Sequence, residues 1–326
     1  MLRYVINRVL MLIPILIGVT LFVFLLMALV PADPAVIALG ADATEESLAM
    51  FREQHGLNYP LPIQYLNYMW GVIRGDFGIS LMSRLTVSSM ISARIGYTLI
   101  LSFASLVFTV VVAMILGIAM AIKQNSIFDN FMRVLTIIFT SMPSFWLALM
   151  LMLLFTVVLG WLPSFGLTSF RHAILPVICI SLAGITLCAR TGRASLLEVI
   201  NRDYIRTARA KGLKYSYVIR KHALGNSMMP MITIYGRMVG QAFTGSIVIE
   251  TIFGINGIGL MMVNALRMLD APVVMGGIIV TAVAMTLANL LTDLAYAFID
   301  PRIKSQFVNH AKRRPKIQTE EAPGNA

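Results

Sequence analysis

The stretch "VLMLIPILIGVTLFVFLLMALV", residues Val9–Val30, decides the fold class. It carries no charge, and sixteen of its residues are Leu, Ile, Val or Phe. At about −0.3 to −0.6 kcal/mol for each of these residues, insertion into a bilayer gains about 5 to 10 kcal/mol. Arg3 and Arg8 precede it as in a signal peptide, but it is longer than a signal segment and no small-residue cleavage site follows. We therefore expect a retained membrane-spanning helix.

The rest of the chain repeats this pattern. Of its 326 residues 58% are hydrophobic and 13% are charged, whereas charged residues make up about a quarter of soluble domains. Five further apolar runs are long enough to span a bilayer: Thr98–Ile122, Val134–Leu159, Ala173–Ala189, Asn226–Ile249 and Pro272–Ala297. The sequence predicts an all-α integral membrane protein with about six transmembrane helices.

The distribution of Lys and Arg predicts the orientation. If the first span starts inside, nineteen of the 26 cationic residues fall in inner segments and six in outer ones, with Arg237 inside a span. Because cytoplasmic loops carry the excess of Lys and Arg, both termini are expected in the cytoplasm. The net charge of +11 fits this bias, so we expect the lipid bilayer and no nucleic acid as a partner.

Three parts of the chain follow from this topology. Residues 1–96 form the first transmembrane helix and an external amphipathic segment, and residues 97–309 form the transmembrane core with a cytoplasmic loop at 190–225. Residues 310–326 are polar, apolar-poor and contain Pro, so we expect a disordered cytoplasmic tail.

The external segment is predicted to form short surface helices without a core of their own. Thr44 is a suitable N-cap, because Glu45 and Glu46 follow it in what would be the first helical turn. The aromatic side chains that we expect at the level of the lipid headgroups are Tyr65, Tyr68 and Trp70.

The motifs that the chain lacks exclude most catalytic functions. There is no Gly-Lys dipeptide and therefore no P-loop, and neither H-E-x-x-H nor G-x-S-x-G occurs. The four histidines are scattered over both predicted sides and the tail, at His55, His172, His222 and His310. Cys179 and Cys188 share one apolar run, which is typical of buried, inert thiols. We expect no catalytic residue, no cofactor, no metal site and no ATP hydrolysis by this chain.

The cytoplasmic loop contains the strongest charge cluster, "DYIRTARAKGLKYSYVIRKHALGNSMMP". Helix-forming residues from Ala194 to Lys211 predict one helix that Gly212 ends. Ala208 and Gly212 are spaced i,i+4, so we expect them to share a face that another backbone can approach closely. A second short helix is predicted at Tyr215–Leu224.

Cationic donors flank this predicted small face. They suit acidic or carbonyl groups of a cytoplasmic protein, so the loop is predicted to be a docking surface. Its candidate residues are Arg206, Ala208, Arg209, Lys211 and Gly212.

Arg237 is anomalous because it lies within the weakly apolar fifth span, near mid-bilayer. This span has seven Leu, Ile, Val or Phe residues, worth about −2 to −4 kcal/mol, against about 2.5 to 3.5 kcal/mol for a central Arg. Arg237 is therefore a candidate for the translocation pathway. A structural ion pair with Asp293, or snorkelling in another register, is the alternative.

Several segments together resemble a known family. The loop "RASLLEVINRDYIRTARAKGLKYSYVIRKHALGNSMMP" closely resembles the EAA-type loop of ATP-binding-cassette (ABC) importer permeases, in particular the dipeptide, oligopeptide and nickel branch. Further segments resemble the same branch in the same order: "MLRYVINRVLMLIPILIGV", "GLNYPLPIQY", "RGDFGIS", "SMPSFWLALMLMLLF", "IVIETIFGINGIG" and "FIDPRIK".

The loop departs from the general EAA pattern in two ways. Arg206-Thr207-Ala208 stands where Glu-Ala-Ala is usual, so only Ala208 and Gly212 match, and the following Pro comes late, at Pro230. Both departures are similar to those of the peptide and nickel branch.

The resemblance implies a type I ABC importer permease in a bacterial or archaeal cytoplasmic membrane. The long external region suggests the first of two permease subunits. The implied partners are a second homologous permease, two cytoplasmic ATPase subunits that receive the loop, and an extracytoplasmic substrate-binding protein. Dipeptides, oligopeptides, glutathione, nickel and metal chelates are the implied substrate range.

Two other classes are weaker alternatives. A self-sufficient secondary transporter or channel would need several intramembrane ionisable groups or an internal repeat, and the spans offer essentially Arg237 and Asp293. A membrane-embedded enzyme would need a nucleophile or metal signature, which the sequence lacks.

Overall fold

The computed structural model describes the backbone of residues 2–30 and 33–299. The side chains that also lie outside this description are those of residues 2–5, 7–9, 12, 237, 241–245 and 293–299. The tail 310–326, which we predicted to be disordered, lies outside the described residues. Every named element in the described part is a helix, which confirms the predicted all-α fold.

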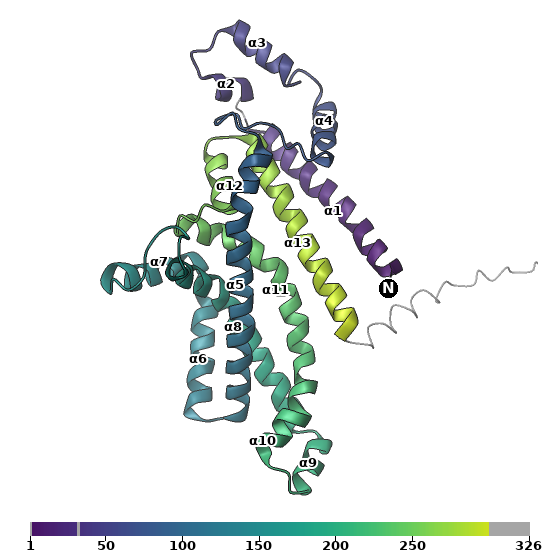
Figure 1. Ribbon diagram of the computed structural model, residues 1–326, viewed down its shortest axis with the longest axis vertical. Helices are drawn as coiled ribbons and strands as arrows, with labels where there is room; N and C mark the ends of the chain where they lie inside the picture. The colour runs from purple at the N-terminus through teal and green to yellow at the C-terminus, as the bar shows by residue number, and fades with distance from the viewer. Residues whose placement is uncertain (1, 31–32, 300–326) are drawn as a thin grey trace, which may run out of the picture.

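Five long helices set the shape of the molecule, and short helices extend from both of its ends (Figure 1). The long helices are α1 (Leu2–Ala28), α5 (Val87–Ile122), α8 (Phe170–Ile200), α11 (Leu224–Ile252) and α13 (Ala271–Ile299). The short helices at one end are α2 (Pro34–Leu39), α3 (Glu45–Gln54), α4 (Leu61–Ile73) and α12 (Ile258–Arg267). At the other end lie α9 (Asp203–Ala210) and α10 (Tyr215–Val218).

Small side chains let the central helices approach closely, as is usual between membrane helices. A Cβ added at Gly117 of α5 would lie 3.0 Å from the carbonyl oxygen of Ala189 of α8. The hydroxyl of Ser181 of α8 donates to the carbonyl of Ser105 of α5 at 2.9 Å. The pair α5 and α8 is therefore the centre of the bundle, on which α11 packs; α13 packs on α11, and α1 packs on α13.

Three described helices are long and apolar enough to cross a membrane: Val87–Ile122, Phe170–Ile200 and Ala271–Thr292. A bent pair, Ile127–Ser141 with Ser144–Val158, makes a fourth if it counts as one span. The first and fifth predicted spans coincide with α1 and α11, which both contain side chains outside the description. The total of six spans stays a prediction.

The third predicted span, Val134–Leu159, is wrong as a single helix. The chain forms α6 (Ile127–Ser141), then α7 (Ser144–Met152) with the π-helical segment η1 (Leu153–Val158). Between these two parts the helix axis bends by 107°. Met142 is extended, with φ −86° and ψ 130°, because the residue before a proline avoids the helical conformation. Pro143 also has no N–H with which to continue the helix.

The external helices have a small core of their own, which corrects our prediction that they lack one. Ala35 of α2, Leu48 and Phe51 of α3, and Leu81 of the loop before α5 are buried against one another. Leu81 lies thirty residues after Phe51, so the spacing of apolar residues within the short helices did not reveal this cluster.

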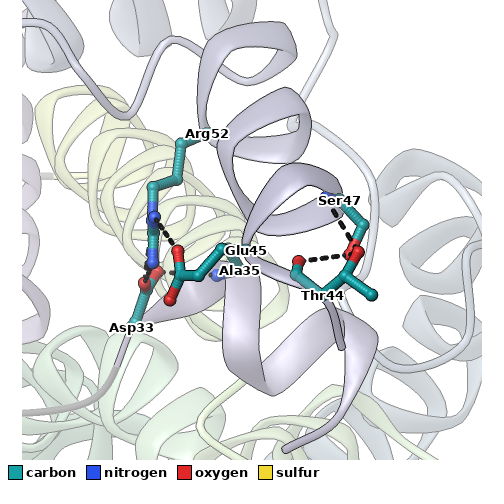
Figure 2. A network of polar contacts seen from close by, with 6 residues as sticks. All are labelled: Asp33, Ala35, Thr44, Glu45, Ser47 and Arg52. Carbon is teal, nitrogen blue, oxygen red and sulfur yellow. Dashed lines mark hydrogen bonds and ion pairs between the residues drawn. The ribbon is translucent and has the colours of Figure 1, made fainter. Parts of the chain in front are cut away.

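An ion pair fixes α2 to α3 (Figure 2). The carboxylate of Asp33 accepts hydrogen bonds from Nε and Nη2 of Arg52 at 2.9 and 2.6 Å, and from the N–H of Ala35 at 2.9 Å. Chiefly because of the hydrogen bonds from Arg52, the pKa of Asp33 is lowered. At the start of α3, the Thr44 hydroxyl accepts from the N–H of Ser47 at 3.3 Å, which confirms the predicted N-cap.

A buried carboxyl, that of Asp270, joins this region to the long helices. Asp270, at the start of α13, accepts hydrogen bonds from the hydroxyl of Ser80 at 2.5 Å and from the N–H of Leu81 at 3.1 Å. The external core is therefore tied to the bundle at a point 189 residues further along the chain.

Glu250, near the end of α11, caps the next helix. Its buried carboxyl accepts from the N–H groups of Gly259 and Leu260, at 2.7 and 3.3 Å, and from the hydroxyl of Thr98 at 2.8 Å. The same Thr98 hydroxyl accepts from the N–H of Ile258 at 2.9 Å. The first N–H groups of α12, which have no partner within their own helix, are thus satisfied by side chains.

We expect Glu250→Leu to lower the free energy of unfolding by about 2 to 5 kcal/mol, because it leaves buried donors without a partner. Glu250→Gln keeps one acceptor oxygen and should lose less. Thermal unfolding of the detergent-purified chain measures both, with Val248→Leu at an exposed position of the same helix as the control. Equal melting temperatures for Glu250→Leu and the unmodified chain would contradict the capping role.

Candidate functional site

The short helices α9 and α10 form an arm that lies at the far end of the molecule from α2–α4 (Figure 1). The predicted continuous helix from Ala194 to Lys211 is wrong, because α8 ends at Ile200 and α9 begins at Asp203. Arg202 between them is extended, with φ −73° and ψ 149°. This break turns the chain so that α9 folds back against the bundle.

Ile205 anchors the arm. Its side chain is 0% exposed and packs with Leu196 of α8, with Val218 at the end of α10 and with Ile219, which follows it. Burying one such side chain is worth about 1.5 to 3 kcal/mol. The arm is therefore held in one place by a small apolar cluster at its base, while the rest of α9 stays accessible.

The expectation that Ala208 and Gly212 share one helical face is wrong. Ala208 is half-buried against the cluster around Ile205. Gly212 lies beyond the end of α9, where Lys211 is the C-cap. Its φ of +82° is favoured by glycine, and no atom lies within 4 Å of the position where a Cβ would be. The prediction that Gly212 ends the helix is confirmed.

Cations and aromatic rings cover the accessible side of the arm. Arg206, Arg209 and Lys211 are exposed, as the docking prediction requires. The guanidinium of Arg209 lies 5.6 Å from the ring centre of Tyr215, and Tyr217 is half exposed beyond it. Arginine and tyrosine are enriched at the centres of protein interfaces. The surface can therefore bind a partner with acidic or carbonyl groups.

A buried ion pair joins α6 to α8 shortly before Leu196, the residue of α8 on which the arm packs. Asp129 of α6 is 0% exposed and accepts from Nε and Nη2 of Arg193 of α8 at 2.7 and 2.8 Å. The N–H of Asn125 also donates to Asp129 at 2.9 Å, which fixes the turn between α5 and α6. Our sequence reasoning missed this pair. The Ser126-x-x-Asp129 spacing of a helix start could have located Asp129, but nothing local pointed to Arg193.

Arg237 lies on α11, as the predicted fifth span requires. Its side chain and that of Asp293 lie outside the described residues, so the pathway role of Arg237 and its pairing with Asp293 both stay predictions. Next to Arg237 on the chain, Met238 helps to line a cavity of about 250 Å³. The other lining residues include Ser105, Thr109, Ser144 and Ile249.

This cavity lies between the central helices and the bent pair. Ser105 and Thr109 come from α5, and Ser144 is the first residue of α7, directly after the bend at Pro143. Hydroxyl groups among apolar walls are typical of small-solute sites between helices. Sequence reasoning singled out none of these residues, because each looks like an ordinary residue of an apolar run.

Two family models cover most of the chain. One, described as "Binding-protein-dependent transport system inner membrane component", matches residues 113–305. The other describes the N-terminal part of such membrane components and matches residues 1–104. Together they include the arm, the bent pair and the external helices.

Individual relatives agree with the family models over nearly the full length. The glutathione transport system permease protein GsiC of Salmonella typhimurium is 40% identical over 304 residues, which is 93% of this chain and 99% of the relative. A Brucella suis protein, named provisionally as a peptide permease protein, is also 40% identical, over 317 residues, with the same coverage of both chains. GsiC of Escherichia coli K12 is 39% identical.

A solved structure shows the same fold. A chain of the MetNI methionine ABC transporter in an inward-facing conformation superposes with a TM-score of 0.52 at 17% identity, over 65% of this chain and 96% of that chain. This likeness supports the predicted type I importer fold. From the two family models and the close relatives together, the chain belongs to the family of inner membrane components of binding-protein-dependent transport systems.

Proposed function

We propose that this chain is one of two permease subunits of an importer for peptides or a related small solute, and that its α9–α10 arm docks an ATPase subunit. As a member of its family, the chain is a multi-pass inner membrane permease component of an ABC importer. It is not an enzyme, because ATP hydrolysis resides in separate subunits. Permeases of this family work with ATPase subunits and a substrate-binding protein.

One observation carries the docking proposal: the arm is anchored at Ile205 and exposes Arg206, Arg209, Lys211 and nearby tyrosines away from the bundle. A fixed base with an accessible cationic surface suits a firm but separable contact with another protein. Because α9 follows α8 and α10 leads into α11, a movement of the docked ATPase reaches two of the helices that line the cavity. Such a connection is needed because the energy for transport comes from ATP hydrolysis in a separate subunit.

The proposed substrate is a short peptide. Two relatives are named for glutathione, a tripeptide, and for peptides. A peptide carries at least one carboxylate, for which a partly desolvated arginine is a good bidentate partner. Arg237 on α11 is the proposed group that meets this charge in the pathway. Nickel or a metal chelate remains within the proposed substrate range.

The proposed assembly pairs this chain with a second homologous permease, two ATPases and an external binding protein. In this arrangement both termini and residues 190–225 face the cytoplasm, and the segment up to residue 96 places its helices α2–α4 outside. Residues 97–309 then form the transmembrane core, and residues 310–326 form the tail.

We expect the triple variant Arg206→Ala, Arg209→Ala and Lys211→Ala to weaken ATPase binding about tenfold to a hundredfold. Each interface charge contributes about 0.5 to 1 kcal/mol to the binding free energy, and about 1.4 kcal/mol corresponds to a tenfold change in the dissociation constant. Co-purification and titration of the ATPase measure it, with Arg267→Ala, an exposed cation at the other end of the molecule, as the control. If the triple variant retained normal ATPase affinity, the arm would not be the docking surface.

We expect Gly212→Leu to lower transport, because a side chain at φ +82° strains the backbone and alters the end of α9. Gly212→Asn is the matched control, since asparagine tolerates this conformation. Uptake and membrane level are measured together. Normal uptake with Gly212→Leu in a fully assembled importer would refute the importance of this turn.

For Arg237, we expect Arg237→Gln to leave assembly intact and to reduce uptake of anionic or zwitterionic peptides, because the pathway loses its carboxylate partner. A structural pair with Asp293 would behave differently: each single variant would lower the amount of protein, and Arg237→Gln with Asp293→Asn would restore it. Membrane levels and uptake of the two single variants and the double variant distinguish these roles. Restoration of protein by the double variant would overturn the pathway role.

A further inference from the structure

Helix α4 turns its apolar side chains outward. Its thirteen residues include no charged one, and none of them is fully buried. Four large apolar residues spaced three, four and three apart lie on one side of the helix. Their exposed fractions are 43% for Ile63, 65% for Leu66, 58% for Trp70 and 73% for Ile73. A helix on a water-facing surface shows the reverse arrangement.

The opposite side of α4 packs on the protein. Its half-buried residues are Tyr65, Tyr68, Met69 and Val72. Of the polar residues of α4, Gln64 turns toward the protein, where its side-chain amide donates to the carbonyls of Leu57 and Tyr59 at 3.0 and 2.8 Å, whereas Asn67 is exposed beside the stripe. The exposed apolar stripe is therefore a fixed feature of the packing.

Tyr65 fixes the depth of α4 relative to the first long helix. Its hydroxyl donates to the carbonyl of Ile17 at 3.1 Å and shares a hydrogen bond of 2.8 Å with the hydroxyl of Thr20. Its ring also lies 5.4 Å from that of Phe24. Because Ile17 precedes the end of α1 at Ala28 by eleven residues, this contact lies about 16 Å along the helix from that end.

This depth places α4 beside the apolar surface of α1. Leu21, Phe22 and Leu25 of α1 are exposed, as lipid-facing side chains are. The hydrocarbon layer of a bilayer is about 30 Å thick and α1 is about 40 Å long, so a contact about 16 Å from the end of a spanning α1 lies within this layer. Figure 1 shows α4 next to the upper part of α1, below α3.

We propose that α4 is a membrane-embedded interfacial helix, whose stripe of Ile63, Leu66, Trp70 and Ile73 lies among the lipid acyl chains of the leaflet on the side of α2–α4. The occupant is lipid because the stripe carries no charge and continues the lipid-facing surface of α1. At its end, the guanidinium of Arg74 lies 4.5 Å from the ring centre of Trp70. Tryptophan is enriched at the boundary between acyl chains and headgroups, so this end of the stripe lies close to the headgroup level predicted for Trp70 from the sequence.

A nitroxide spin label at Leu66→Cys tests this directly. Cys179 and Cys188 are buried and should not react with the label. The labelled chain is reconstituted in phospholipid nanodiscs with its importer partners, whose reactive cysteines are replaced. Collision rates are then measured with oxygen, which concentrates in lipid, and with nickel-EDDA, which stays in water. The matched control is Tyr59→Cys, exposed in the turn before α4 and outside the stripe.

We expect oxygen to exceed the nickel complex severalfold at Leu66→Cys, and the reverse at Tyr59→Cys. Dominant collision with the nickel complex at Leu66→Cys would place the stripe in water and overturn the proposal. Low collision rates with both reagents would show that protein covers the stripe, whether the binding protein or the second permease, and would overturn it as well. If Leu66→Cys does not assemble, Ile73→Cys on the same stripe gives the same reading.

Discussion

Inside a bilayer, every backbone N–H and C=O must find its partner within the protein, and this constraint explains most of the fold. Unbroken helices satisfy it automatically, which accounts for the long α5, α8 and α13. The difficult places are the helix ends between them. At the start of α12, the carboxyl of Glu250 and the hydroxyl of Thr98 replace the partners that water would supply elsewhere. A polar side chain in an apolar region is thus the direct result of stopping one helix and starting another.

The sequence predicted elements whose signal is local. Apolar length located the long helices, Gly212 marked the end of α9, and Thr44 marked the start of α3. The bend at Pro143 could also have been predicted, because the residue before a proline is disfavoured in a helix. The apolar run continues across Pro143, however, and for this reason we predicted one unbroken span. In these cases the answer depends on a few neighbouring residues only.

What the sequence could not show depends on residues far apart. Asp129 and Arg193 meet across 64 positions, and the external core needs Leu81 beside Phe51. The direction of Ala208 follows from Ile205, which draws that side of α9 into the bundle and leaves the cationic side outside. The cationic candidates are exposed and their docking role stays a prediction, whereas the small face expected beside them does not exist. The residue types of α9 can be taken from the sequence, but which side of the helix faces the bundle depends on packing against distant residues.

The return from the arm has a mechanical consequence. From Tyr215 to Ile252 the chain is helical throughout, through α10, the π-helical segment η2 (Ile219–Ala223) and α11. This continuous helical segment carries a tyrosine of the arm surface at one end and a residue of the cavity wall near the other, at Ile249. Its path is about 57 Å at 1.5 Å per residue, and it includes Pro230, where a helix bends. Because no loop interrupts it, a displacement of the arm is passed to the cavity wall through backbone hydrogen bonds alone, with Pro230 as the place where the segment can flex.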